Sequence, residues 1–351
     1  MSNKLKNMDA KTPLIVLYGG NSPEHDVSRS SALHVVKAID LNRYETYLIA
    51  IDQDGSWYEF SHNISTEEQS NFQGTLPIEG TLIHPMEYFQ SFKNSQPLVF
   101  PLLHGPNGED GTIQGLIHLS GVPYIGSKVL SSALCMDKIK CKELLSNYKI
   151  PQTNWTSVHR ANAHDADLSV LSPDVDLFVK PANMGSSIGV TKVTDRNDIE
   201  AALSHAAQYD EWLIVEEAIR GREIEVAVLE NDQPLASVPG EITPGAEFYD
   251  YKDKYENGAI QHIPSALSES ETAEVQGLAI KVFNILRCRG LARVDFFYDD
   301  EAKIWFVNEI NTMPGFTPIS MFPKLWNASG MSYEDLIDTL IQNALIDSPM
   351  E

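Results

Sequence analysis

The sequence predicts an α/β protein that begins with a parallel αβ domain. Two apolar runs carry this prediction, Pro13–Tyr18 and Pro97–Leu103, because each ends in a loop containing glycine and leads into a segment with apolar residues at helical spacing. Strand, loop and helix repeated in that order are typical of parallel sheets whose strands are connected by helices. We therefore expect an N-terminal αβ domain over residues 1–130.

The pattern changes after residue 130. A helical segment over residues 131–145 is followed by strand candidates at 176–180, 213–217 and 222–229. In the last of these, apolar residues alternate with Glu223 and Glu225, which places both carboxylates on one face. We expect a central lobe over 131–221 and a C-terminal lobe over 222–351. The stretch 243–261 has little periodicity, and its length predicts a functional loop.

Composition restricts the class of partner. The chain has 351 residues, with 26 Lys plus Arg against 49 Asp plus Glu and a net charge of -23. Such a surface repels nucleic acid and anionic lipid, so we expect neither as a partner, and an anionic ligand must meet locally placed cations. The sequence has no signal-peptide pattern and no apolar run of membrane-spanning length, which predicts a cytoplasmic protein. Three cysteines without a CxxC pair predict reduced thiols.

Residues 290–315 contain the pattern with the most chemical information. Two strand-like runs flank a polar turn, and a hairpin would place Asp295 near Glu309, with Arg293 and Asn311 on the same faces. Two carboxylates and an amide oxygen suit Mg²⁺, although a solvated strand face is the alternative. Because Arg293 adds a cation, the set favours a phosphoryl-transfer site.

Two further segments are typical of nucleotide binding. In KPANMGSSIG, Lys180 ends an apolar strand and precedes a loop that can cover phosphates, although its order differs from the GxxxxGK[ST] P-loop. In LIVEEAIRGRE, Glu216, Ile219 and Glu223 are placed to meet adenine and ribose. Ordinary glycine loops and solvated strand ends are the alternatives. No GxGxxG follows the first strand, which argues against a nicotinamide dehydrogenase.

Taken together, the motifs resemble those of one family. The chain carries, in order, GGNSPEHDVS, HGPNGEDGTIQG, MDK, KPANMGSSIGV, EEAIRGRE, YDYKDKY, ARVDFF and NEINTMPGFTPIS. This series resembles the D-alanine–D-alanine ligases of the ATP-grasp superfamily over nearly the whole chain. The resemblance implies a three-lobed ATP-grasp fold, in which the N-terminal domain over residues 1–130 binds substrate, and a homodimer. It also implies ATP-dependent joining of two D-alanines through an acyl phosphate, for peptidoglycan synthesis.

The resemblance assigns residues to the nucleotide and to metal. Those implied to bind ATP are Lys138, Lys180, Ser186, Ser187, Glu216, Ile219, Glu223, Lys254 and Asn308. Those implied to hold two Mg²⁺ ions, for which Mn²⁺ can substitute, are Asp295, Glu309 and Asn311.

The resemblance also assigns residues to the amino acids and to catalysis. Glu24 is implied to hold the ammonium of the first D-alanine beside His104, and Ser320 and Met321 to receive the carboxylate of the second. The residues implied to act in catalysis are Glu24, Ser186, Tyr255, Arg293 and the backbone N–H of Gly315. Tyr255 would join Ser186 and Glu24 in a hydrogen-bonded network that closes the site against water. A satisfied loop histidine and a turn hydroxyl remain the alternatives for His104 and Ser320.

The choice of acceptor is less constrained. Ligases that form D-alanyl-D-lactate generally carry a different residue where this chain has Tyr255, which favours an amine acceptor. A D-alanyl-D-serine or D-alanyl-D-lactate ligase is the alternative enzyme. An inactive nucleotide-binding regulator would ordinarily lack a metal ligand or a phosphate cation, and this chain retains all of them.

Overall fold

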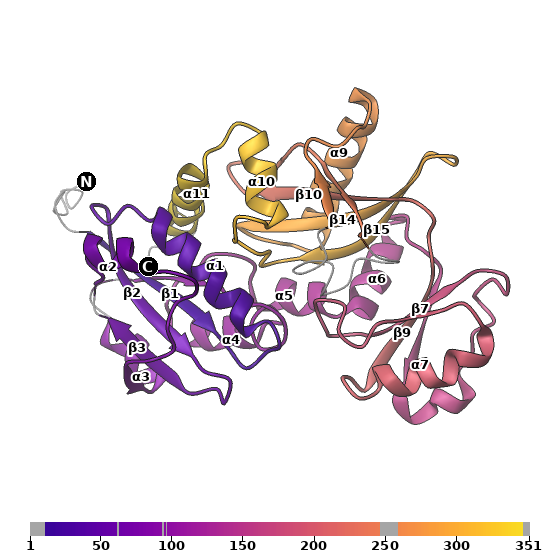
Figure 1. The fold of residues 1–351 in the computed structure, drawn as a ribbon, viewed down its shortest axis with the longest axis horizontal. Coiled ribbons are helices and arrows are strands. Elements are labelled where there is room, and N and C mark those ends of the chain that lie inside the picture. The colour runs from indigo at the N-terminus through magenta and orange to yellow at the C-terminus, as the bar shows by residue number, and fades with distance from the viewer. Residues whose placement is uncertain (1–10, 62, 93–94, 96, 246–258, 347–351) are drawn as a thin grey trace.

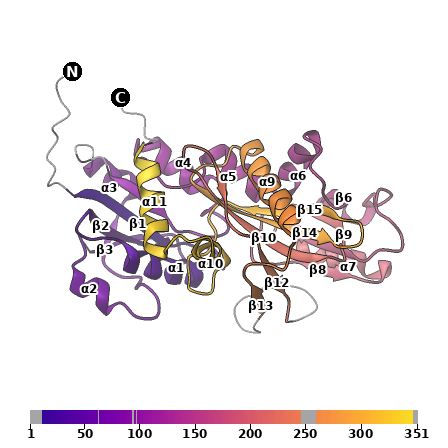
Figure 2. The same cartoon turned by 90° about the horizontal axis from the view of Figure 1, so that it is seen from above.

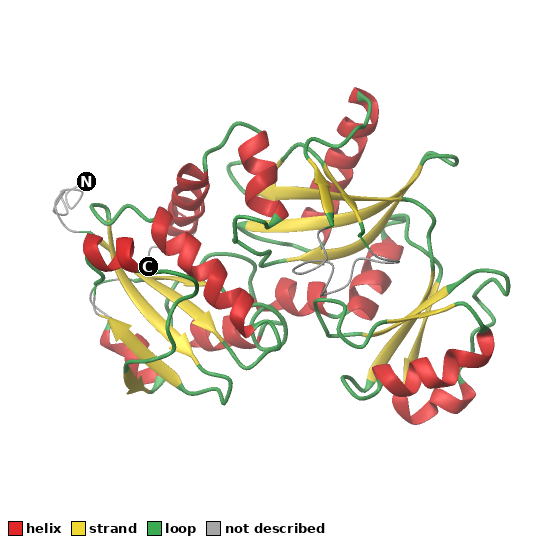
Figure 3. Cartoon of the chain, in the orientation of Figure 1, coloured by secondary structure: helices red, strands yellow, loops and turns green. Residues whose placement is uncertain are grey.

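The computed structural model describes residues 11–61, 63–92, 95, 97–245 and 259–346. Three separate sheets lie along the molecule, each with helices packed against it (Figures 1 and 3). This arrangement confirms the predicted α/β fold with three lobes.

The first sheet has the strand order β4-β3-β2-β1-β5. As predicted, β1 (Thr12–Gly19) pairs in parallel with both β2 (Tyr44–Ile51) and β5 (Leu98–Pro101). The sheet is nevertheless mixed, because β3 (Trp57–Ser61) and β4 (Thr81–Ile83) extend it in antiparallel fashion. The turn at 52–56 explains this difference, since a connection so short can join only antiparallel neighbours.

Helices cover the first sheet. They are α1 (His25–Ala38), α2 (Thr66–Asn71), α3 (Pro85–Ser91) and α4 (Thr112–Leu119). The glycine turn after β1 leads directly into α1, so the residues around Glu24 stand at the carboxyl end of the parallel strands. In parallel αβ sheets this end commonly carries the ligand site.

The second sheet is antiparallel, in the order β6-β9-β7-β8. Its strands are β6 (Trp155–His159), β9 (Trp212–Glu217), β7 (Leu177–Pro181) and β8 (Thr191–Val193). Helix α7 (Ile199–Ala206) and the short 3-10 helices Arg160–Asp165 and Arg196–Asp198 accompany it. Ala202, Leu203 and Ala206 of α7 are buried in the same apolar cluster as β7 and β9.

The third sheet is antiparallel, in the order β13-β12-β10-β14-β15, with β11 paired to β10. Its strands are β10 (Arg222–Leu229), β11 (Leu235–Ala236), β12 (Gly240–Thr243), β13 (Ile260–His262), β14 (Leu291–Asp299) and β15 (Ile304–Asn311). Helix α9 (Glu269–Ile285) packs on it and begins with a capping box between Ser268 and Glu271.

Helices α5 (Val129–Met136) and α6 (Lys138–Asn147) contribute Cys135, Cys141 and Leu145 to the apolar cluster of the third sheet. The beginning of the predicted central lobe therefore shares the core of the C-terminal lobe. The boundaries at 130 and 221 stay a prediction. All three cysteines are buried and unbridged.

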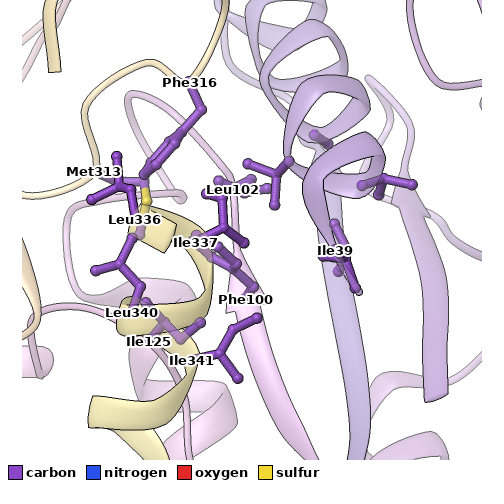
Figure 4. Close-up of a cluster of buried hydrophobic side chains, with 14 of the residues drawn as sticks. Ile39, Phe100, Leu102, Ile125, Met313, Phe316, Leu336, Ile337, Leu340 and Ile341 are labelled. Carbon is purple, nitrogen blue, oxygen red and sulfur yellow. The ribbon is translucent and has the colours of Figure 1, made fainter. Parts of the chain in front are cut away.

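The C-terminal helices return to the first domain. After α10 (Met321–Ala328), α11 (Tyr333–Ile346) lies beside that domain in both orientations (Figures 1 and 2). Leu336, Ile337, Leu340 and Ile341 of α11 share one buried cluster with Phe100 of β5 (Figure 4). The first and third lobes therefore share a continuous apolar core.

Within the ranges given above, none of the helices is both long enough and apolar enough to cross a lipid bilayer.

Candidate active site

A cavity of about 410 Å³ is lined by β7 and β9 of the second sheet and by β10, β14 and β15 of the third. The residues predicted for ATP or metal that line it are Lys138, Lys180, Ser186, Ser187, Glu216, Ile219, Glu223, Asp295, Asn308 and Glu309. Segments separated by more than a hundred residues in sequence thus meet around one space. Their roles toward ATP and metal stay predictions.

The hairpin of β14 and β15 pairs as the sequence predicted. Asp295 lies directly opposite Glu309 and Arg293 opposite Asn311, with a bulge immediately after Asp295. The guanidinium of Arg293 donates two hydrogen bonds to Asp295, at 2.7 and 2.6 Å, and the amide of Asn311 donates a third at 2.9 Å. The carboxylate of Asp295 is therefore held in one orientation at the cavity wall.

Glu225 is a member of this cluster that the sequence analysis did not single out. It pairs with Asp295 across β10 and β14, is 1% exposed, and lies 3.0 Å from the guanidinium of Arg293. Burial disfavours the charged guanidinium, but Asp295 and Glu225 outweigh burial and hold the pKa of Arg293 well above its ordinary value. The alternation of β10 was the available signal, since it put Glu225 on the polar face.

Glu216 stands between two lysines. Its carboxylate lies 2.8 Å from Nζ of Lys142 and 2.6 Å from Nζ of Lys180. Burial opposes ionisation of Glu216, but the two ammonium groups together outweigh it and lower its pKa to about 2. The predicted contact of Glu216 with adenine stays a prediction. Lys142 was not predicted as a functional residue, although it follows Lys138 by one helical turn.

The loop after β7 joins the cavity to the first domain. Nζ of Lys138 donates a hydrogen bond to the carbonyl of Met184 at 2.7 Å. Ser186 and Ser187 both have left-handed backbone conformations, with φ of 51° and 56°. Non-glycine residues rarely adopt this left-handed conformation, and those that do cluster at active sites and ligand-binding turns. The hydroxyl of Ser186 donates to the carboxylate of Glu24, which forms one link of the predicted Ser186–Glu24–Tyr255 network.

A second cavity, of about 90 Å³, adjoins the first, and Ser186, Glu225 and Glu309 line both. The residues predicted for the amino acids and for catalysis that line it are Glu24, His104, Ser186, Arg293, Gly315, Ser320 and Met321. A Cβ atom on Gly315 would come within 2.7 Å of Oγ of Ser320, so any larger residue here would displace the Ser320 hydroxyl.

His104 is buried and both of its ring nitrogens are occupied. Nδ1 lies 3.0 Å from the carbonyl oxygen of Met313 and Nε2 lies 3.1 Å from Oγ of Ser31. Burial lowers the pKa of His104, and a neutral ring that donates from Nδ1 and accepts at Nε2 satisfies both contacts. His104 therefore ties the first domain to the segment that leads to Gly315. Its role as a substrate ligand stays a prediction.

Glu109, a second residue of the HGPNGEDG loop, gives a testable pH dependence. Burial first, and then the charge of Glu24, raise its pKa from 4.5 to about 8. The folded protein thus keeps a proton that the unfolded chain releases above pH 4.5, so this group costs stability progressively as pH rises toward 8. We expect Glu109→Gln, which resembles the protonated form, to lose several degrees less in Tm than the unsubstituted protein between pH 5 and pH 8.

Thermal unfolding of both proteins at intervals of pH measures this difference. Glu301→Gln, which removes one exposed carboxylate from the hairpin turn, controls for the change in net charge. Parallel curves of Tm against pH for the Glu109→Gln and unsubstituted proteins would contradict the raised pKa.

The ends of the predicted functional loop, residues 243–261, pair with each other beside the first cavity. Thr243 pairs with Ile260 across β12 and β13, and Thr243 and Pro244 line the cavity. Lys254 and Tyr255, which were predicted to act on ATP and in catalysis, lie outside the described residues.

Comparison with known proteins agrees with this geometry. Residues 13–127 match a family model described as D-ala D-ala ligase N-terminus, and residues 144–342 match D-ala D-ala ligase C-terminus. The chain is 45% identical over 340 residues to D-alanine–D-alanine ligase B of Clostridium tetani, covering 95% of this chain and 94% of that one. It is 42% identical over 348 residues to the D-alanine–D-alanine ligase of Clostridium acetobutylicum, covering 95% and 98%.

Two solved structures share the whole fold. The D-alanine–D-alanine ligase of Coxiella burnetii superposes with a TM-score of 0.78 at 35% identity, covering 96% of this chain and 95% of that chain. The VanG D-Ala:D-Ser ligase of Enterococcus faecalis superposes with a TM-score of 0.81 at 32% identity, covering 95% and 100%. Matches of this extent confirm the resemblance seen in the motifs, and the chain belongs to the D-alanine–D-alanine ligase family.

Proposed function

We propose that this protein joins two D-alanines into D-alanyl-D-alanine with ATP, through an acyl phosphate, for peptidoglycan synthesis. The observation that carries the proposal is the junction of the two cavities. The larger one is lined by Lys138 and Lys180, and the smaller one by Glu24 and Arg293. This arrangement suits transfer of a phosphoryl group to the carboxylate of a small amino acid. The names of the relatives support the same reaction.

The residues of the hairpin fit a divalent cation. Asp295 and Glu309 face each other in register, and Asn311 is oriented by its bond to Asp295. The residues that the structure describes contain no group of three or more His, Cys, Asp or Glu side chains that could hold a metal ion. A set of two carboxylates and an amide oxygen suits Mg²⁺, which takes its remaining oxygens from phosphates and water. We propose two Mg²⁺ ions, replaceable by Mn²⁺, which when bound would neutralise charge on the transferring phosphoryl group.

In the proposed first step, Glu24 holds the ammonium of the first D-alanine and directs its carboxylate toward the larger cavity. A carboxylate oxygen attacks the γ-phosphorus of ATP, and the bond to the ADP oxygen breaks. Lys138, Lys180 and Arg293 hold the phosphates and offset the charge that would otherwise repel the attacking carboxylate. The products of this step are an acyl phosphate and ADP.

In the proposed second step, the second D-alanine binds through its carboxylate near Ser320 and Met321. Its amine, after losing a proton, attacks the acyl carbon, and inorganic phosphate leaves. Arg293 and the backbone N–H of Gly315 stabilise the negative oxygen of the tetrahedral intermediate. The loop 243–261, with Lys254 on ATP and Tyr255 bonded to Ser186 and Glu24, belongs to this proposal as the lid that excludes water.

The identity of the acceptor amino acid is the part of the proposal for which a specific alternative exists. The VanG D-Ala:D-Ser ligase shares the fold with a TM-score of 0.81, so D-serine is the second candidate for the acceptor position beside Met321. We also propose a cytoplasmic location, where ATP is available, and a homodimer, which sedimentation can test.

Product analysis tests the reaction directly. Phosphate release is measured with ATP, Mg²⁺ and each of D-alanine, L-alanine, D-serine and D-lactate, alone and in pairs with D-alanine. We expect turnover with D-alanine alone and D-alanyl-D-alanine as the dominant product by mass spectrometry. A preference for mixed products would assign the protein to the ligases that use D-serine or D-lactate as acceptor. An absence of turnover in all mixtures would refute the proposed ligase activity.

A further inference from the structure

Lys142 is a buried cation behind the larger cavity. It lies on α6 one turn after Lys138 and is 3% exposed, and it is not part of the wall of either cavity described above. Its Nζ lies 2.8 Å from one carboxylate oxygen of Glu216, whose other oxygen lies 2.6 Å from Nζ of Lys180. Helix α6 and strands β7 and β9 thus supply three charges in a row, of which Glu216 and Lys180 line the cavity.

The order of these charges has an electrostatic consequence. Glu216 is ionised, because the two lysines hold its pKa at about 2. With Lys180 alone as partner, the negative charge of Glu216 would cancel the positive charge offered to the nucleotide. With Lys142 as a second partner, the row carries one net positive charge. Buried charges interact strongly because water screens them little. In a chain of net charge -23, a cation at the phosphate site must come from such local placement.

We infer that Lys142 is a positioning residue that compensates Glu216, so that Lys180 keeps its positive charge and its orientation for the nucleotide phosphates. This inference rests on the proposed use of ATP. A purely structural role is the competing explanation, but packing alone does not require these charges, since apolar side chains of similar volume can often replace a whole buried ion pair without loss of stability. The two explanations differ in what each predicts for nucleotides with different numbers of phosphates.

Lys142→Met removes the charge and keeps most of the volume of the side chain. We expect Kd for ATP to rise about ten-fold, with smaller increases for ADP and then AMP, and Kd for adenosine to change less than about two-fold. Lys140→Met is the matched control, because Lys140 lies on the same helix with a side chain 56% exposed and its loss changes the net charge equally. Binding is measured at constant Mg²⁺, without D-alanine, by displacement of a fluorescent ADP analogue.

The double variant Lys142→Met/Glu216→Gln restores one net positive charge, because it also removes the carboxylate that cancels the charge of Lys180 in the single variant. We expect it to recover the ratio of adenosine Kd to ATP Kd seen in the unsubstituted protein, even if the single variant is unstable. Equal weakening of ATP and adenosine, no change for either, or a double variant that keeps the lowered ratio would overturn the inference. If the unsubstituted protein does not bind ATP, the proposed function itself fails, which is a different result.

Discussion

Arg293→Met is expected to lower kcat by about a thousand-fold or more, the range seen when a cation is removed from a phosphoryl-transfer site. Arg293 faces the smaller cavity and is held by Asp295 and Glu225 at 2.6 and 3.0 Å. In the proposed reaction it acts in both steps, first against charge on the phosphoryl group and then against the tetrahedral oxygen. Because both effects belong to transition states, kcat should fall far more than KM for ATP rises.

The measurement is steady-state turnover at saturating ATP and Mg²⁺, together with Tm for each protein. Loss of Arg293 leaves Asp295 and Glu225 without their cation, so a lower Tm is also expected, and kcat is compared at a temperature where both proteins are folded. Arg289→Met provides the control, since Arg289 pairs with Glu230 and its side chain is 43% exposed. A folded Arg293→Met protein with kcat within ten-fold of the unsubstituted protein would exclude the proposed role.

Glu309→Gln is expected to lower turnover by about a hundred-fold or more and to raise the Mg²⁺ concentration needed for half-maximal rate. Glu309 and Glu225 both line the two cavities and pair with Asp295, but the side chain of Glu309 is 31% exposed and that of Glu225 only 2%. Glu309 is therefore the carboxylate better placed to meet a metal between nucleotide and amino acid. Glutamine keeps the shape of the side chain but lacks the negative charge that attracts a divalent cation.

Two readouts separate metal binding from general damage. The first is the Mg²⁺ dependence of the rate, and the second is Mn²⁺ binding followed by electron paramagnetic resonance in the presence of ADP. Glu301→Gln, at the exposed turn of the same hairpin, should behave as the unsubstituted protein in both. An unchanged Mg²⁺ requirement and unchanged Mn²⁺ affinity in Glu309→Gln would place the metal elsewhere.

The hairpin was the part of the site that local sequence predicted best. Alternation in two runs joined by a short turn restricts the pairing register to few choices, and the structure has Asp295 opposite Glu309. The parallel pairing of β1 with β5 was also predictable, because each strand ends in a loop that begins a helix. The antiparallel extension by β3 was missed, because its apolar character is weaker and only the short turn before it indicated its direction.

The partners of single side chains were less predictable. Glu216 was assigned to adenine from its place at a strand end, which stays a prediction, and its contacts with Lys142 and Lys180 were not foreseen. His104 was assigned to substrate, which also stays a prediction, and the contacts of its ring with Ser31 and Met313 were not foreseen. Each of these contacts joins elements that are distant in sequence, so no periodicity within one element could reveal it.

The sequence by itself determined the α/β class, the pairing register of the hairpin and the number of charged side chains. Side-chain alternation and turn residues act over a few neighbouring positions, so they can be read from local sequence. Only the tertiary structure decided how those charges are distributed. The packing of α6 against the second and third sheets brought Lys142 to Glu216, and the return of α11 to the first domain joined the first and third lobes in one apolar core. Such contacts depend on the burial of apolar surface between distant segments, and this burial is a property of the whole fold.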